Sequence, residues 1–397
     1  MTIGTADAQY LLPGELALQP EVIRRVLTEV DPLVPAVAAA VVEGGIRDIV
    51  MTGCGDSLFS AMAASFAFLR FSRRLTIPAH ALEYSRAIYR SSGPETLVCA
   101  LSYSGETRRT VEAAIAAKSV GAKLLGISRD RTGTIAGQAD HFLPNASLEE
   151  RSNCRTGSFQ AAYLALVLLG AHTAHRSGDL DDAGLESVRE GIRALADAVQ
   201  RYIEPAGELG RRAAEHIGKA GTVHFIGGGE AHAVALYGAA KLYETSSLPA
   251  VPQETEQFAH CEIFSLERDS VVVVVALRGP FYQRAVEVAD AVRTIGATVI
   301  GVSDEPAFER HADLLLEVPS GAFADFSTSL AVIPLQWLAF HDAVARGSDP
   351  DLVRHKAVNS PLIRACPIWS AEDYAREERE QVRASRDSAR VEHGHDA

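Results

Sequence analysis

The sequence predicts an α/β fold made of two tandem doubly wound sandwiches, each with a parallel sheet in a flavodoxin-like strand order. Apolar segments such as VVVVVAL and KLLGIS alternate with amphipathic helical segments, and strands that are apolar on both faces belong to parallel sheets covered by helices. The pattern then repeats. The glycine turns at Gly53 and Gly227 lie 174 residues apart, and those at Gly126 and Gly301 lie 175 apart. This near-constant offset indicates a duplication.

The 397 residues divide into four expected segments. These are an N-terminal arm and helix (1–40), a first copy with a connector helix (41–195), a second copy (196–347), and a C-terminal loop and charged tail (348–397). In open parallel sheets, ligands bind beyond the carboxyl ends of the strands. The strand-to-helix turns are therefore the places to search for a site.

Composition narrows the class of protein. The net charge is −13 and no basic stripe lies on an expected helix, so nucleic acid is not an expected partner. No apolar run approaches the length of a membrane span, and no secretory signal begins the chain. The five cysteines are scattered without a C-x-x-C pair. We therefore expect a cytoplasmic protein without disulfides or a metal site.

The segment LSYSGETRRT places hydroxyl groups at a strand-to-helix turn. A strand is expected to end at Leu101 and a helix to begin near Thr107. A helix N-terminus offers free N–H groups and a positive dipole end. Ser102, Ser104 and Thr107 add hydroxyls there, and Gly105 allows a close approach of the backbone. This arrangement suits a phosphate monoester, although the same hydroxyls could merely cap the helix.

The neighbouring turn and the second copy differ in the groups they offer. Ser57, in GCGDS, is expected to complete the hydroxyl group around the phosphate. The second copy has LRGPFYQ at the place of SYSGET, without the hydroxyls, so we expect the copies not to form two equal sites. GGGEAH fails the dinucleotide fingerprint because His232 replaces its last glycine. We interpret it as a tight turn or as part of the second crevice.

Four of these motifs together resemble a known family. GCGDS, SYSGET, AAKLYETS and EQFAH are similar to tandem sugar isomerase (SIS) domains. The resemblance is to the isomerase half of glucosamine-6-phosphate synthase and to the glucosamine-6-phosphate deaminase and fructosamine-6-phosphate deglycase group. It covers roughly residues 14 to 360, and the spacing of sixteen residues from Glu244 to His260 matches the family.

The resemblance implies roles for individual residues. The sugar phosphate would be held by Ser57, Ser102, Tyr103, Ser104 and Thr107. Glu244 would move a proton between C1 and C2, with Lys241 on the same helix face. His260 would open the sugar ring in the neighbouring subunit, which implies a homodimer. Lys356 would be the C-terminal loop lysine that assists ring opening and can form an imine.

Some of these residues also allow interpretations without a catalytic role, and others differ from the family pattern. Lys241 and Glu244 could form an ordinary helical pair, and His260 could be a satisfied histidine. Tyr103 stands where many members carry glutamine. Cys261 and Glu262 replace a Gly-Pro pair, and we hypothesise that Glu262 tunes the histidine or contacts an amino group of the substrate.

We therefore expect a phosphosugar isomerase that acts on an aminohexose or ketosamine 6-phosphate, with isomerisation coupled to loss of the amine. It should need no metal and no organic cofactor. No cysteine lies near the N-terminus, so no glutaminase activity is expected. A fructosamine-6-phosphate deglycase and a plain aldose–ketose isomerase are alternatives. A non-catalytic sugar-phosphate-binding regulator is the rival from another class, but it has no reason to keep the Glu244–His260 pair.

Overall fold

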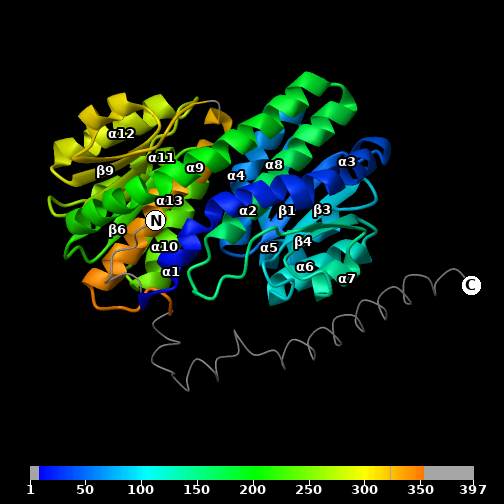
Figure 1. The fold of residues 1–397 in the computed structure, drawn as a ribbon, viewed down its shortest axis with the longest axis horizontal. Helices are drawn as coiled ribbons and strands as arrows, with labels where there is room; N and C mark the ends of the chain where they lie inside the picture. Colours follow the sequence, from blue (N-terminus) through cyan, green and yellow to red (C-terminus); the bar gives the residue numbers. More distant parts are fainter. Residues whose placement is uncertain (1–8, 322, 353–397) are drawn as a thin grey trace, which may run out of the picture. The chain divides into compact units, whose positions relative to one another are not determined.

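The computed structural model describes residues 9–321 and 323–352, which contain two five-stranded sheets (Figure 1). The first sheet has the order β2-β1-β3-β4-β5, with strands β1 (Asp48–Gly53), β2 (Thr76–His80), β3 (Thr96–Leu101), β4 (Lys123–Ser128) and β5 (His141–Pro144). The second has the order β10-β9-β8-β6-β7, with strands β6 (Val223–Gly227), β7 (Ala250–Glu254), β8 (Val271–Val275), β9 (Thr298–Ser303) and β10 (Leu314–Glu317). All strand pairs are parallel. Numbered within its own copy, each sheet has the order 2-1-3-4-5, so the predicted flavodoxin-like fold is confirmed.

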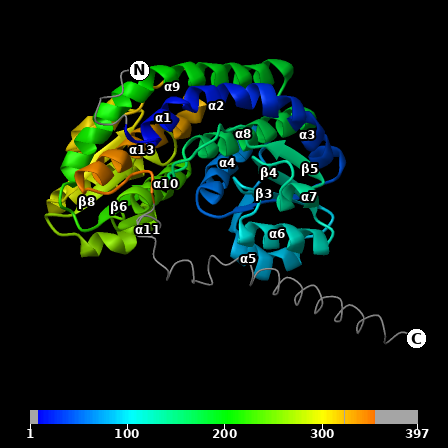
Figure 2. The same ribbon diagram turned by 60° about the horizontal axis from the view of Figure 1, so that its bottom comes forward.

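Helices cover both faces of each sheet (Figures 1 and 2). On the first sheet, one face carries α4 (Asp56–Ser72) and α8 (Gly157–Ser177), and the other carries α5 (Ala81–Arg86), α6 (Arg108–Ser119) and α7 (Thr134–Gln138). On the second sheet, one face carries α10 (Glu230–Thr245) and α13 (Ser327–Ala345), and the other carries α11 (Thr255–His260) and α12 (Tyr282–Ile295). The valines of β8 show why the sheet needs both layers. Val273 belongs to the core under α10, whereas Val272 and Val274 belong to the core under α12.

Four further helices join the copies. The N-terminal arm forms α1 (Leu12–Ala17), α2 (Gln19–Arg25) and α3 (Val34–Glu43). The connector is α9 (Asp182–Ile217), which packs against α13 and α2. It spans the predicted boundary between residues 195 and 196, and that boundary stays a prediction.

The helices α4 and α10 pack against each other in antiparallel fashion, and this contact positions the candidate site. Asp56 in the first turn of α4 bonds to Lys241 near the end of α10. Arg70 near the end of α4 pairs with Glu230 in the first turn of α10. Each helix therefore presents its N-terminus, at the carboxyl edge of its own sheet, to the far end of the other helix.

A series of buried hydrogen bonds also supports the contact between α4 and α10. Gln160 donates to Gln19 at 3.0 Å, and Gln19 donates to Gln336 at 2.8 Å. Gln336 donates to the Tyr237 hydroxyl at 2.8 Å, which donates to the carbonyl of Arg155 at 3.0 Å. The three glutamines are fully buried. This series of hydrogen bonds links the N-terminal arm to both copies.

Replacing Gln336 by Met should destabilise the protein by about 2–3 kcal/mol, because Gln19 and Tyr237 would lose buried partners. Urea unfolding of the whole chain measures this. The matched control is Arg24→Ala, which removes an exposed ion pair with Asp197 and should cost less than about 1 kcal/mol. Equal losses in the two variants would contradict the role given to this series of hydrogen bonds.

Candidate functional site

The hydroxyls of SYSGET surround the start of α6, as the sequence predicts. β3 ends at Leu101 and α6 begins at Arg108. The Ser102 Oγ and Thr107 Oγ1 atoms lie 2.8 Å apart. The Ser102 oxygen also accepts the N–H groups of Gly105 and Thr107, at 3.2 and 3.3 Å. Thr107 is the N-cap residue, yet its side chain makes no capping bond. The simple capping interpretation therefore does not account for this hydroxyl.

Ser57 lies beside this turn because β1 and β3 are neighbours in the sheet. It stands in the first turn of α4 and is half-buried. Gly53 shows how close the two turns come, since a Cβ there would lie 2.9 Å from the Ser57 Cβ and 3.0 Å from the Leu101 carbonyl oxygen. A side chain at residue 53 would push the two turns apart.

Tyr103 lines a hollow next to Ser104, at the turn between β3 and α6. The guanidinium of Arg155 lies 4.7 Å from the centre of its ring, and that of Arg129 lies 6.0 Å away. The hollow is lined by Tyr103, Ser104, Arg129 and Asp130. Arg129 therefore lies beside the Ser104 hydroxyl in this hollow, where a cation suits a phosphate dianion, and Arg155 lies near it against Tyr103.

Lys241 and Glu244 are brought together with Asp56, a residue that the sequence analysis did not single out. Lys241 is fully buried. Its Nζ donates to Asp56 Oδ2 and Glu244 Oε2, both at 2.7 Å, and to the Arg155 carbonyl at 3.1 Å. One ammonium is thus shared by two carboxylates, and Asp56 is the direct neighbour of Ser57 in α4. Lys241 and Glu244 therefore do not form an ordinary i,i+3 pair on the protein surface.

The surroundings give Glu244 a pKa raised from 4.5 to about 7. Burial is the main cause, since it disfavours the charged carboxylate, and the negative charge of Asp56 adds to it. Lys241 opposes the shift. For Lys241 itself, burial lowers the pKa, but Asp56 and Glu244 outweigh burial and hold the pKa well above its ordinary value. Lys241 therefore stays charged at neutral pH, whereas Glu244 can take up and release a proton.

His260 is not brought to this cluster within one chain. It ends α11, whose Phe258 packs in the core on the face of the second sheet opposite α10. Its side chain is 72% exposed and its Nε2 lies 3.0 Å from Glu256 Oε1. The hypothesised partner Glu262 accepts instead from Gln253 at 2.7 Å. Lys356 lies outside the described residues.

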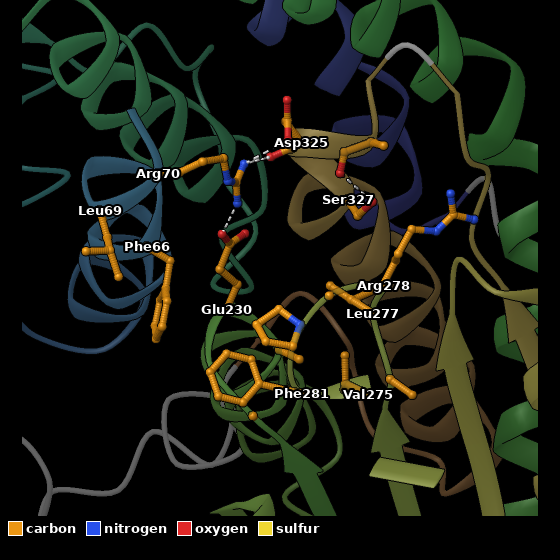
Figure 3. A pocket seen from close by; sticks show the side chains of 16 residues that line it. Phe66, Leu69, Arg70, Glu230, Val275, Leu277, Arg278, Phe281, Asp325 and Ser327 are labelled. Carbon is orange, nitrogen blue, oxygen red and sulfur yellow. Dashed lines mark hydrogen bonds and ion pairs between the residues drawn. The ribbon is translucent and has the colours of Figure 1, made fainter. Parts of the chain in front are cut away.

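The second copy has its own crevice at the carboxyl ends of β6 and β8, drawn in Figure 3. The cavity has a volume of about 440 Å³. The Phe281 ring lies against Gly228 and Gly229, where α10 begins, and a Cβ on Gly229 would come within 2.3 Å of it. Arg70 is paired with Glu230 and Asp325. The start of α10 is thus covered by a ring and not by hydroxyls, in keeping with the expected inequality of the copies.

Sequence reasoning missed Asp56 and Arg155. Asp56 had a signal in the duplication, since GCGD and GGGE both place an acid directly after the glycine turn. Arg155 lies between β5 and α8 in a segment without regular structure, where no periodicity marks it.

Among the helices that the structure describes, none has the length and apolar character of a membrane span.

Comparisons with known proteins agree with this architecture. The SIS domain profile matches residues 46–172 and 216–346, so the chain belongs to the SIS domain family and carries two copies of the domain. Glutamine–fructose-6-phosphate aminotransferase of Gloeobacter violaceus is 29% identical over 314 residues, which are 79% of this chain and 51% of that protein. The chain thus spans about half the length of this curated relative.

Solved structures share the fold. The C-terminal domain of glucosamine-fructose-6-phosphate aminotransferase from Francisella tularensis aligns with a TM-score of 0.78 at 20% identity, covering 88% of this chain and 100% of that one. Glucosamine-6-phosphate deaminase of Thermotoga maritima aligns with a TM-score of 0.65 at 20% identity, covering 86% of this chain and 96% of that one. At these identities the likeness concerns the fold.

The raised pKa of Glu244 predicts a pH dependence of stability. A carboxyl group whose folded-state pKa lies above its unfolded value stabilises the fold at low pH, and this contribution is lost as pH rises through the folded pKa. Between pH 4.5 and 7, wild type should lose up to about 3 kcal/mol of unfolding free energy relative to Glu244→Gln. Urea unfolding of both proteins across this range measures the difference. Parallel stability curves would show that Glu244 titrates normally.

Proposed function

We propose that the chain is a phosphosugar isomerase that acts on an aminohexose or ketosamine 6-phosphate and couples aldose–ketose isomerisation to loss of the amine. The observation that carries the proposal is the placement of the Glu244 carboxyl group beside the first turn of α4, where it shares the Lys241 ammonium with Asp56. That turn also holds Ser57, next to the hydroxyls of SYSGET. A base near neutrality and a phosphate-binding turn are what this chemistry requires.

In the proposed reaction, the phosphate binds to Ser57, Ser102, Tyr103, Ser104 and Thr107. Ring opening exposes an aldehyde at C1 beside the amine at C2. Glu244 removes the proton from C2 and returns it to C1, which turns the amine into an imine at C2. Water adds to this imine, and ammonia leaves as the C2 ketone forms. The charged Lys241 lies next to Glu244 and holds its carboxyl group in place.

Two roles in this scheme belong to residues outside the cluster. We infer that His260 opens the ring in the site of a second subunit, because its side chain is exposed and lies across the sheet from Glu244 in its own chain. Lys356 is proposed as a second ring-opening residue that can form an imine with a ketose. Both assignments come from the family resemblance, and they make the functional unit at least a homodimer.

The names of the similar proteins support the choice of substrate class. They include an aminotransferase of fructose 6-phosphate and a deaminase of glucosamine 6-phosphate. A deglycase runs the proton shift from C1 to C2 of a ketosamine and loses the amine by hydrolysis of an imine at C1, and a plain isomerase lacks the final hydrolysis. A sugar-phosphate-binding regulator needs the hydroxyls but no base, and the half-buried Glu244 held by Lys241 speaks against it.

A panel assay tests the proposal. Wild type is given glucosamine 6-phosphate, fructose 6-phosphate with ammonia, and fructosamine phosphates, and ammonia and ketose are measured. We expect turnover of at least one substrate, with kcat/KM rising with pH up to about 7 as Glu244 loses its proton. Glu244→Gln should lower kcat by roughly 10²–10⁴-fold. Ligands that raise the Tm without any turnover would favour the regulator.

Mixing two inactive variants tests the shared site. Glu244→Gln and His260→Asn should each lack activity as homodimers. After subunit exchange, half of the dimers are hybrids with one intact site of two, so activity should recover to about a quarter of the wild-type value. His260→Asn mixed with itself is the control. A mixture that stays inactive would contradict the role of His260 in the partner's site.

A further inference from the structure

The duplication has produced a matched pair of ion pairs between α4 and α10. Gly55 and Gly229 both have positive φ angles, of 54° and 61°, and each is followed by an acid in the first turn of a long helix. Asp56 of the first copy binds Lys241 of the second. Glu230 of the second copy binds Arg70 of the first, as the dashed line in Figure 3 shows. The two acids are therefore structural counterparts.

The counterparts differ in how completely they are satisfied. Both carboxylate oxygens of Glu230 have partners, since Oε1 pairs with Arg70 and Oε2 accepts from Thr328 at 3.0 Å. Asp56 uses only Oδ2, and its Oδ1 is buried without a hydrogen-bond partner among the described residues. Each acid shares its cation with a further carboxylate, since Lys241 also binds Glu244 at 2.7 Å and Arg70 also pairs with Asp325. The buried, unpartnered Oδ1 therefore distinguishes Asp56 from its counterpart.

We propose that Asp56 is a positioning residue that shares the Lys241 ammonium with Glu244 and so keeps Glu244 able to accept a proton. The inference rests on the proposed function, in which Glu244 is the base. With Lys241 alone, Glu244 would be one half of a buried ion pair and a weak base. With Asp56 bound to the same ammonium, the three groups form a carboxylate–ammonium–carboxylate set with one excess negative charge. A proton on Glu244 then neutralises that excess.

The other groups that face Glu244 do not supply this effect. Arg155 is the second cation, and its charge acts against protonation of Glu244. Burial raises the pKa of Cys154 and of Tyr237 well above their ordinary values, so both stay neutral near pH 7. Among the described residues that act on Glu244, Asp56 therefore provides the negative charge.

The test compares Asp56→Asn with wild type through the pH dependence of kcat/KM, using the substrate that wild type turns over. Removing the negative charge should make Glu244 a weaker base, so the acidic limb should move to lower pH by about one unit. Asp56→Ser is the second variant and should move the limb in the same direction. The matched control is Glu230→Gln, which breaks the counterpart ion pair and should leave the limb in place.

A substrate-free measurement separates this inference from the proposed function. The infrared carboxyl signal of Glu244, obtained as the difference from Glu244→Gln, is followed against pH in the wild-type and Asp56→Asn backgrounds. We expect its titration to move to lower pH in Asp56→Asn, whether or not any sugar phosphate is turned over. An unmoved titration would overturn the role of Asp56 and leave the proposed function standing. If neither Asp56 variant folds, as judged by circular dichroism and size exclusion, Asp56 is a structural residue and the proposal fails.

Discussion

The structure depends on one buried ammonium that holds two helices from different copies together. Taking a lysine out of water costs several kcal/mol, and only close opposite charges repay it. Lys241 finds two such charges, Asp56 on α4 and Glu244 on its own helix. Because the ammonium is fully buried, loss of either carboxylate would leave it with a single charged partner. The relative placement of α4 and α10 is thereby fixed where the candidate site needs it.

Much of the fold follows from the sequence because its signals are local. Continuous apolar strands, glycine turns and a constant offset predict two parallel sheets, and the hydroxyl turn at SYSGET lies where the strand and helix patterns place it. Asp56 and Lys241 are 185 residues apart, and their pairing depends on the packing of α4 against α10. That packing is decided by side chains buried all along both helices. No local pattern encodes this packing, so the acid after the glycine turn could mark Asp56 as a candidate but could not predict its contact with Lys241.

His260 and Arg155 show what a sequence motif can and cannot predict about the candidate site. His260 and Glu244 are close in sequence, yet β7 and α11 carry the chain across the sheet between them. Sequence spacing therefore says nothing about their distance within one chain. The role of His260 in a partner's site therefore comes from the family resemblance and not from the spacing of the two residues. Arg155 illustrates the reverse case, since contact with Tyr103 places it in the site although no motif marks it.

The antiparallel packing also explains why a duplicated chain should build its site in one crevice. Glu230 and Glu244 are fourteen residues apart on α10, which is about 21 Å along a helix. The carboxylate at the end of α10 is therefore remote from the second crevice, where α10 begins, and adjacent to the first turn of α4. In the proposed reaction, the second copy supplies the base and the first copy supplies the hydroxyls. The second copy's own crevice, covered by Phe281, has no equivalent base from α4, because the residue that α4 brings to it is Arg70.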